Sequence, residues 1–139
     1  MGVMLQEFIE APSVYACLIC RAHIAKRDDV ISRTFQGRLG RAYLTESVVN
    51  ARLGEGEDRL LMTGMHTVCN LHCRLCDSVI GWKYVHAFDK SQQYKEGRYV
   101  LEQSRIYSID QPVEVSADVH LLQLASCELG ADVTSSMMI

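Results

Sequence analysis

The sequence has little of what marks several large classes of protein. Two prolines and nine glycines among 139 residues exclude low-complexity and collagen-like chains. An apolar content of 48% excludes a largely disordered chain. No apolar run approaches the ~18–20 residues that a membrane-spanning helix needs, so we expect no membrane partner. The formal charge of −3 lacks the basic excess of a dedicated nucleic-acid binder, which argues against a nucleic-acid partner.

The charges divide the chain into three parts. Residues 13–110 hold all 14 Lys and Arg and carry a net +3, whereas residues 1–12 carry −2 and residues 111–139 carry −4. The length fits one domain, which we place at 13–110, with an N-terminal segment before it and an acidic tail after it. The tail is either disordered or forms a short helix from Ser116 to Gly130. The first ten residues lack the positive charge of a signal peptide. We therefore expect a reducing location, nucleus and cytoplasm.

Short runs rich in β-branched and aromatic residues predict a mainly β, antiparallel domain. The runs cover residues 42–45, 47–52, 60–63, 66–69, 79–88 and 99–109. Two glycines in segment 54–56 predict a break between the second and third runs, and segment 95–97 predicts a turn before the last. Segment 28–35 fits either a helical turn or a strand.

Four of the six cysteines form two Cys-x-x-Cys pairs. Cys17 and Cys20 make the first pair, Cys73 and Cys76 the second, and 52 residues separate the pairs. A two-residue spacer lets both thiolates of a turn face one cation, and two such turns complete a tetrahedron around zinc. The sequence therefore predicts one Zn²⁺ ion, structural rather than catalytic because four thiolates fill its shell. The alternatives are unrelated free thiols or a redox-active pair, which would need a thioredoxin-like βαβ context.

The positions of these cysteines and of several other residues resemble those of the yippee-like proteins over roughly residues 13–107. The shared pattern comprises the two cysteine pairs together with Gly40, Leu44, Asn50, Gly64, Gly81-Trp82-Lys83-Tyr84, Lys95 and Glu102. Every element of this pattern is present at the family's spacing. The resemblance does not extend to the tail.

The resemblance implies a β-tent, in which two antiparallel sheets meet at an angle and are pinned by a zinc ion with four cysteine ligands. The cereblon ligand-binding domain, centromere-licensing proteins and zinc-containing methionine sulfoxide reductases share this architecture. In cereblon, segments similar to those around His66 and Trp82 build an aromatic pocket for cyclic imides. The resemblance thus implies a ligand or peptide cleft at His66, Trp82 and Tyr84, able to take a small cyclic amide-like ligand.

The same residues have a plainer interpretation. Trp82 and Tyr84 stand at positions i and i+2 of a strand and share one face, which would simply be core. His66 would then be a core histidine with its hydrogen bonds made. Gly81 lets either another backbone or a ligand approach closely. The sequence leaves both interpretations open.

Three functions compete. The resemblance implies a non-enzymatic regulator of cell growth or division that binds proteins, with an adaptor role in a ubiquitin-ligase assembly of the CTLH/GID type. An enzyme of the sulfoxide reductase type would need a nucleophilic thiol. Only Cys69 and Cys127 remain for that role, and neither lies in a motif that lowers a thiol pKa. A nucleic-acid-binding zinc domain is the third function, although the basic residues alternate with acidic ones.

Overall fold

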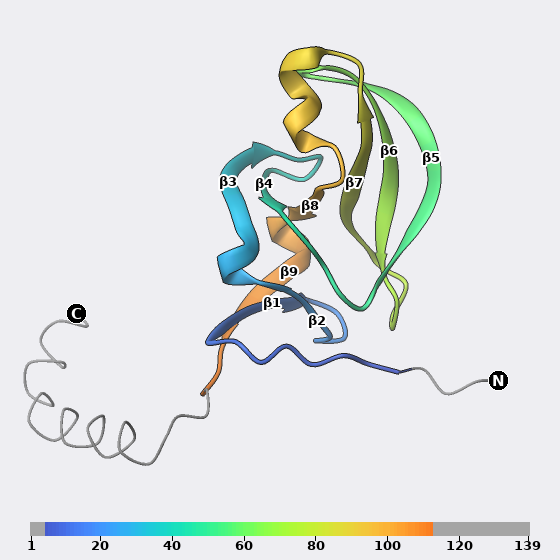
Figure 1. Cartoon of the computed structure of the whole chain (residues 1–139). Coiled ribbons are helices and arrows are strands. Elements are labelled where there is room, and N and C mark those ends of the chain that lie inside the picture. The colour runs from blue at the N-terminus through green and yellow to red at the C-terminus, as the bar shows by residue number, and fades with distance from the viewer. Residues whose placement is uncertain (1–4, 113–139) are drawn as a thin grey trace, which may run out of the picture.

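The computed structural model describes residues 5–112, and within them the chain is built almost wholly of strands (Figure 1). The strands are β1 (Ser13–Cys17), β2 (His23–Lys26), β3 (Val30–Gln36), β4 (Arg41–Thr45), β5 (Ala51–Leu61), β6 (Gly64–Cys73), β7 (Val79–Ala87), β8 (Tyr99–Glu102) and β9 (Ile106–Asp110). Three short 3-10 helices join some of them: η1 (Arg27–Asp29), η2 (Lys90–Lys95) and η3 (Gln103–Arg105). The helix or disorder predicted for the acidic tail concerns residues outside the described part of the chain.

The strands form two antiparallel sheets, as predicted. One sheet has three strands in the order β2-β1-β9, and the other has six in the order β3-β4-β8-β7-β6-β5. Figure 1 shows that the six-stranded sheet is strongly curved and that the smaller sheet lies across one end of it. This is the β-tent arrangement. It brings the two cysteine pairs, one at the end of β1 and one at the end of β6, to the junction of the sheets.

Several boundaries predicted from the sequence are wrong. The run predicted at 47–52 is a loop as far as Asn50, and the run predicted at 60–63 includes the turn between β5 and β6. β5 runs unbroken through residues 54–56, because a β-bulge between Leu53 and Gly56 accommodates one extra residue without ending the pairing with β6. The single run predicted at 99–109 is interrupted by η3 and supplies β8 to one sheet and β9 to the other. The ambiguous segment 28–35 contains both alternatives, since η1 leads directly into β3.

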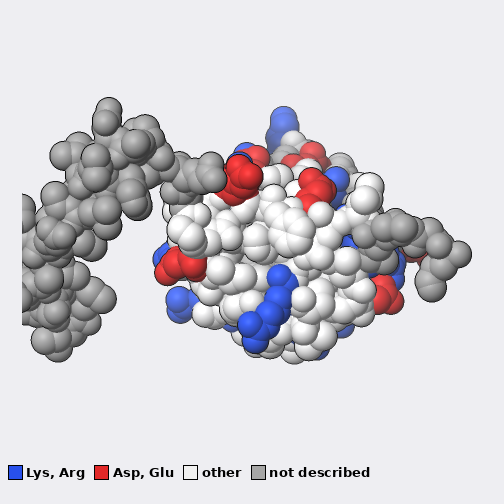
Figure 2. All heavy atoms as spheres, turned by 90° about the horizontal axis from the view of Figure 1, so that it is seen from below, with Lys and Arg blue, Asp and Glu red and all other residues white. Residues whose placement is uncertain are grey.

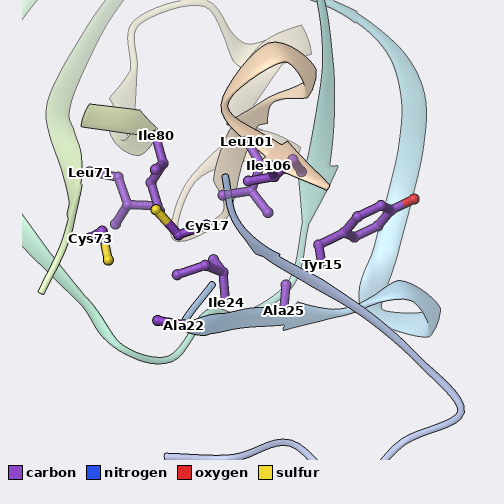
Figure 3. Packing of buried hydrophobic residues seen from close by; sticks show 10 residues of the cluster. All are labelled: Tyr15, Cys17, Ala22, Ile24, Ala25, Leu71, Cys73, Ile80, Leu101 and Ile106. Atoms are coloured by element: carbon purple, nitrogen blue, oxygen red, sulfur yellow. The ribbon is translucent and has the colours of Figure 1, made fainter. Parts of the chain in front are cut away.

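One apolar core fills the space between the two sheets (Figure 3). Its fully buried members come from both sheets, and Ile24 of β2 and Leu71, Ile80 and Leu101 of the larger sheet are its largest aliphatic side chains. The ligand cysteines of β1 and β6 belong to the same cluster. The metal site is therefore continuous with the packed interior.

A second apolar cluster lies within the six-stranded sheet. Its centre is Val68, Trp82, Tyr84 and Val100, and it is flanked by Phe35 from edge strand β3 and by Leu61 from the opposite edge strand β5. Side chains from both edges thus pack on the same cluster, which means that the sheet curls until its edges face each other. This curl creates the cavity described below.

Residues 5–12, predicted to precede the domain as a separate segment, pack against it. The buried Asn50 side chain accepts a hydrogen bond from the Glu7 N–H (2.8 Å) and donates to the carbonyl oxygens of Glu7 and His23 (both 2.8 Å). Arg74, beside the second cysteine pair, donates to the Asn50 Oδ1 (3.2 Å) and to the Leu5 carbonyl. One buried amide therefore ties the N-terminal segment to the metal region. No helix in residues 5–112 is long and apolar enough to cross a membrane.

Candidate metal centre and aromatic cavity

The two cysteine pairs fold into turns of the same geometry. In the first turn the Cys17 N–H donates to the Ala22 carbonyl (2.8 Å) and the Arg21 N–H donates to the Cys17 carbonyl (2.9 Å). In the second, Cys73, Asp77 and Ser78 make the equivalent two bonds at 2.8 Å each. The residue after each pair, Arg21 or Asp77, adopts a left-handed conformation with φ of 66° or 67°. The two halves of the site are therefore related by structure as well as by sequence.

The turns bring four sulfur atoms into one cluster. All four Sγ atoms lie within 4.8 Å of one another, with 3.6 Å between Cys17 and Cys76 and 3.4 Å between Cys20 and Cys73. Zn–S bonds of about 2.3 Å in a tetrahedron require S···S edges of about 3.8 Å. The donor set and its spacing fit one structural zinc ion, and a shell of four thiolates leaves no position for a substrate.

Burial favours the protonated thiol at two of the four cysteines, so zinc must displace protons there. Burial raises the pKa of Cys20 to about 12 and also raises the pKa of Cys73. Burial acts in the same direction on Cys76, but hydrogen bonds from Ser78 lower its pKa to about 7. Zinc binds thiolates, so its binding must release protons from this cluster, and its affinity falls as the pH falls.

The second feature is a cavity of about 480 Å³ inside the curl of the six-stranded sheet. Trp82 and Tyr84, predicted from the sequence as cleft residues, lie on its wall. The other lining residues come from the end of β3 and the loop after it, from the β5–β6 turn and from η2: Thr34, Phe35, Gln36, Gly37, Arg38, Leu60, Leu61, Met62, Thr63, Tyr94 and Lys95. A volume of this size and an apolar wall are typical of small-ligand sites.

His66, the third predicted cleft residue, does not line the cavity. Its side chain is fully buried, its Nδ1 lies 2.9 Å from the Gly64 carbonyl, and its ring packs on Tyr84 with centroids 5.1 Å apart. A bulge between Thr67 and Val68 shifts the register of β6 against β7 and places His66 opposite Ala87. His66 therefore supports the cavity wall from behind.

Replacing His66 with Ala should lower the free energy of unfolding by about 2–4 kcal/mol, because it removes a buried ring and its hydrogen bond. Denaturant unfolding of the variant measures this loss. Replacing the neighbouring exposed Met65 with Ala should cost far less and is the matched control. A His66→Ala protein as stable as the Met65→Ala protein would contradict this assignment.

Lys95 is a site residue whose role the sequence analysis missed. It is only 3% exposed, although lysine is among the residues least often buried. Its Nζ donates to Thr63 Oγ1 (2.8 Å) and lies 5.2 Å from the Phe35 ring centroid and 5.3 Å from that of Tyr84. Burial lowers its pKa. The only signal in the sequence was its place in the family pattern.

Glu102, another member of the pattern, shapes the opposite wall. Its buried carboxylate accepts hydrogen bonds from the backbone N–H groups of Arg38 (2.9 Å) and Leu39 (3.4 Å). Gly37 touches the same carboxylate so closely that an added Cβ would overlap it. Glu102 thereby fixes the loop that carries Arg38 to the rim of the cavity.

The remaining candidate features form no second site among the described residues. Cys69 is buried in β6, lies outside the sulfur cluster and does not line the cavity, and Cys127 lies outside the described residues. On the face shown in Figure 2, Lys and Arg are scattered among Asp and Glu and form no continuous basic stripe. Arg33, Arg38 and Arg41 are exposed.

Comparison with known proteins identifies the family of this chain. Residues 13–117 match the family described as Yippee zinc-binding/DNA-binding/Mis18, centromere assembly. The chain belongs to this family. It is 54% identical over 88 residues to human protein yippee-like 3, covering 63% of this chain and 74% of that one. It is 53% identical over 92 residues to rat protein yippee-like 4, covering 66% and 72%.

A solved structure agrees with the fold of this yippee-family chain. The crystal structure of the Mis18 'Yippee-like' domain superimposes with a TM-score of 0.59 and 16% sequence identity, covering 73% of this chain and 99% of that domain. At this identity the match establishes the shared fold alone. The predicted family, fold and structural zinc are therefore confirmed.

Proposed function

We propose that this yippee-family chain is a non-enzymatic interaction module that regulates cell growth or division by binding a segment of a partner protein in its aromatic cavity. The cavity itself is the observation that carries the proposal. It is a hollow of about 480 Å³ that Trp82 and Tyr84 line together with aliphatic side chains. None of the four clustered cysteines lines the cavity, so the zinc centre serves it only by stabilising the fold.

The chemistry of the site favours binding over catalysis. Four cysteines are committed to the metal, whose shell they fill. Cys69 is buried between strands, where its Sγ faces Gly56, and it does not reach the cavity. A sulfoxide reductase would require a thiol at the substrate site, and the lining has none.

The wall of the cavity suits a compact group with both apolar and polar atoms. The half-buried Phe35 ring and the exposed Tyr94 ring offer flat apolar surface. The buried Trp82 and Tyr84 form the base of the wall, and Lys95 supplies N–H donors. A side chain or backbone turn with a carbonyl oxygen, or a small cyclic amide, would complement this wall.

The place of action follows from the family resemblance. We propose that the module works in the nucleus and cytoplasm, as an adaptor within a ubiquitin-ligase assembly of the CTLH/GID type. Proteins are its partners, and neither a membrane nor a nucleic acid is needed for binding.

Quantitative affinity capture from cell extract tests this function. Tyr94 lines the cavity but is 52% exposed, so Tyr94→Ala should fold and should lose at least three-quarters of the captured partner, because one aromatic wall is removed. Phe88→Ala is the matched control, since Phe88 is equally exposed but lies outside the cavity. Mass spectrometry would identify subunits of the ligase assembly among the proteins lost. Equal capture by both variants would contradict the proposal.

A further inference from the structure

The charges that line the cavity are all of one sign. Lys95 and Arg38 are among the lining residues, and no Asp or Glu is. In the part of the chain that the structure describes, neither cation forms a salt bridge with any carboxylate. Glu102, beside the loop, has both carboxylate oxygens engaged by backbone N–H groups. The side chains that line the cavity thus include two cations and no carboxylate.

Lys95 is held in place as a fixed donor. Its side chain is 97% buried, so few rotamers are open to it. One of its three N–H groups donates to Thr63 Oγ1. The rings of Phe35, Tyr84 and Tyr94 lie 5.2, 5.3 and 5.9 Å from its Nζ, and their π faces stabilise the charge but accept no full hydrogen bond. Two N–H groups of a buried ammonium therefore remain for a ligand.

Lys95 is the donor that points to a ligand. Buried donors are ordinarily paired, and Lys95 is a lining residue of the cavity with one protein acceptor, Thr63 Oγ1, for its three N–H groups. The Trp82 Nε1 is sealed behind the wall beside the Tyr84 side chain and is not available to an occupant. A buried, incompletely paired ammonium on the wall of a cavity indicates that an acceptor group belongs there.

We propose that the cavity binds an organic carboxylate carried on an apolar body, with the carboxylate at Lys95 and the body against Phe35, Leu61 and Tyr94. This rests on the proposed function, in which the cavity is a binding site, and it names the chemistry of the occupant. Arg38, at the rim, attracts the anion as it enters. The carboxylate can come from a free organic acid or from the C-terminus of a polypeptide that ends in an apolar residue.

A site of this kind should distinguish a charged ligand from a neutral ligand of the same shape. A hydrogen bond between an ammonium and a carboxylate is roughly twice as strong as one between neutral groups, and more so away from water. A carboxylate should therefore bind more tightly than the matching carboxamide, by about tenfold or more. A lysine that served only to support the fold would give no such preference.

The test is a titration of the full, zinc-loaded chain with four probes, read by calorimetry and by the fluorescence of Trp82, the single tryptophan of the chain. The probes are 3-phenylpropanoate, 3-phenylpropanamide, acetyl-Ala-Ala-Phe with a free C-terminus and the same peptide as its amide. Binding of both acids supports recognition of the carboxylate alone. Binding of the peptide acid only supports a polypeptide C-terminus as the natural source.

Variants locate the charge. Lys95→Met keeps the aliphatic stem and should reduce the preference for acid over amide to about onefold, whereas Lys90→Met, an exposed lysine of the same helix, should retain it. Arg38→Gln, at the exposed rim, should weaken binding of the acids severalfold and tests the charge even if Lys95→Met does not fold.

Two results would overturn the inference. If the amides bind as tightly as the acids, the carboxylate assignment fails, while the cavity remains a binding site as proposed. If the acid preference survives in Lys95→Met, or if Arg38→Gln leaves the affinity for the acids unchanged where Lys95→Met does not fold, the carboxylate is not recognised here. The capture experiment with Tyr94→Ala is independent of both results, so failure of the function and failure of the ligand class can be told apart.

Discussion

Replacing Cys73 with Ser should unfold the domain. The free energy of binding structural zinc is typically about 10–16 kcal/mol in small metal-binding peptides, and it contributes to folding because the four ligands come together only in the folded chain. The whole stability of a domain this size is about 5–15 kcal/mol. Cys73 is fully buried and lies in the core between the sheets. Its loss therefore removes the metal and disturbs that core together.

Circular dichroism and metal analysis of the purified protein measure this result. The wild type should hold one zinc per chain, and Cys73→Ser should hold none and should lose its β signal. Cys69→Ser is the control, because Cys69 is a buried cysteine of the same strand that is not a ligand. A soluble Cys73→Ser protein with native circular dichroism and no metal would refute the structural role of zinc.

Replacing Gly81 with Ala should be almost as damaging. A Cβ at this position would overlap the carbonyl oxygen of Val100 and lie 2.8 Å from its carbonyl carbon. Both atoms belong to the backbone of β8, which pairs with β7 at this point and cannot move without losing its hydrogen bonds. We expect a loss of at least about 4 kcal/mol, at the upper end of what single substitutions cause.

Thermal unfolding would show this loss as a fall of well over 10 °C in the melting temperature. Gly56→Ala is a matched glycine substitution in a strand, and there a Cβ would meet Cys69 Sγ at 3.7 Å and Thr67 Cγ2 at 3.8 Å, both ordinary contacts. If Gly81→Ala and Gly56→Ala have the same melting temperature, β7 and β8 can separate at this point with little loss of stability.

The metal centre could be predicted from the sequence because its information is local. Each pair of ligands lies within four residues, and two pairs of this spacing in one chain are typical of a zinc site. The strands were predicted less well where glycines intervene. Residues 54–56 resemble a turn in composition, yet β6 supplies pairing partners along the whole of β5, and a bulge costs less than ending the strand.

The cavity could be predicted only in part. Trp82 and Tyr84 are two residues apart on one strand. The sequence therefore predicts that their side chains share a face of the sheet. Phe35 and Lys95 reach the same cavity only because the sheet curls and brings its edges together. No pattern within one segment encodes that contact. The position of His66 depends on a similar non-local feature, since a bulge in the pairing of β6 with β7 sets its register.

The pairing of β1 with β9 determines how the domain would respond to a mechanical load. Ser13 lies opposite Asp110, and Cys17 lies opposite Ile106, so the chain enters and leaves at the same end of this antiparallel pair. Tension applied through the two ends would peel the strands apart one residue pair at a time. On the β1 side the load would then reach Cys17, where the zinc bonds resist it. On the β9 side the load would pass through η3 to β8, so a pull on the chain is held by the metal at one end and by the six-stranded sheet at the other.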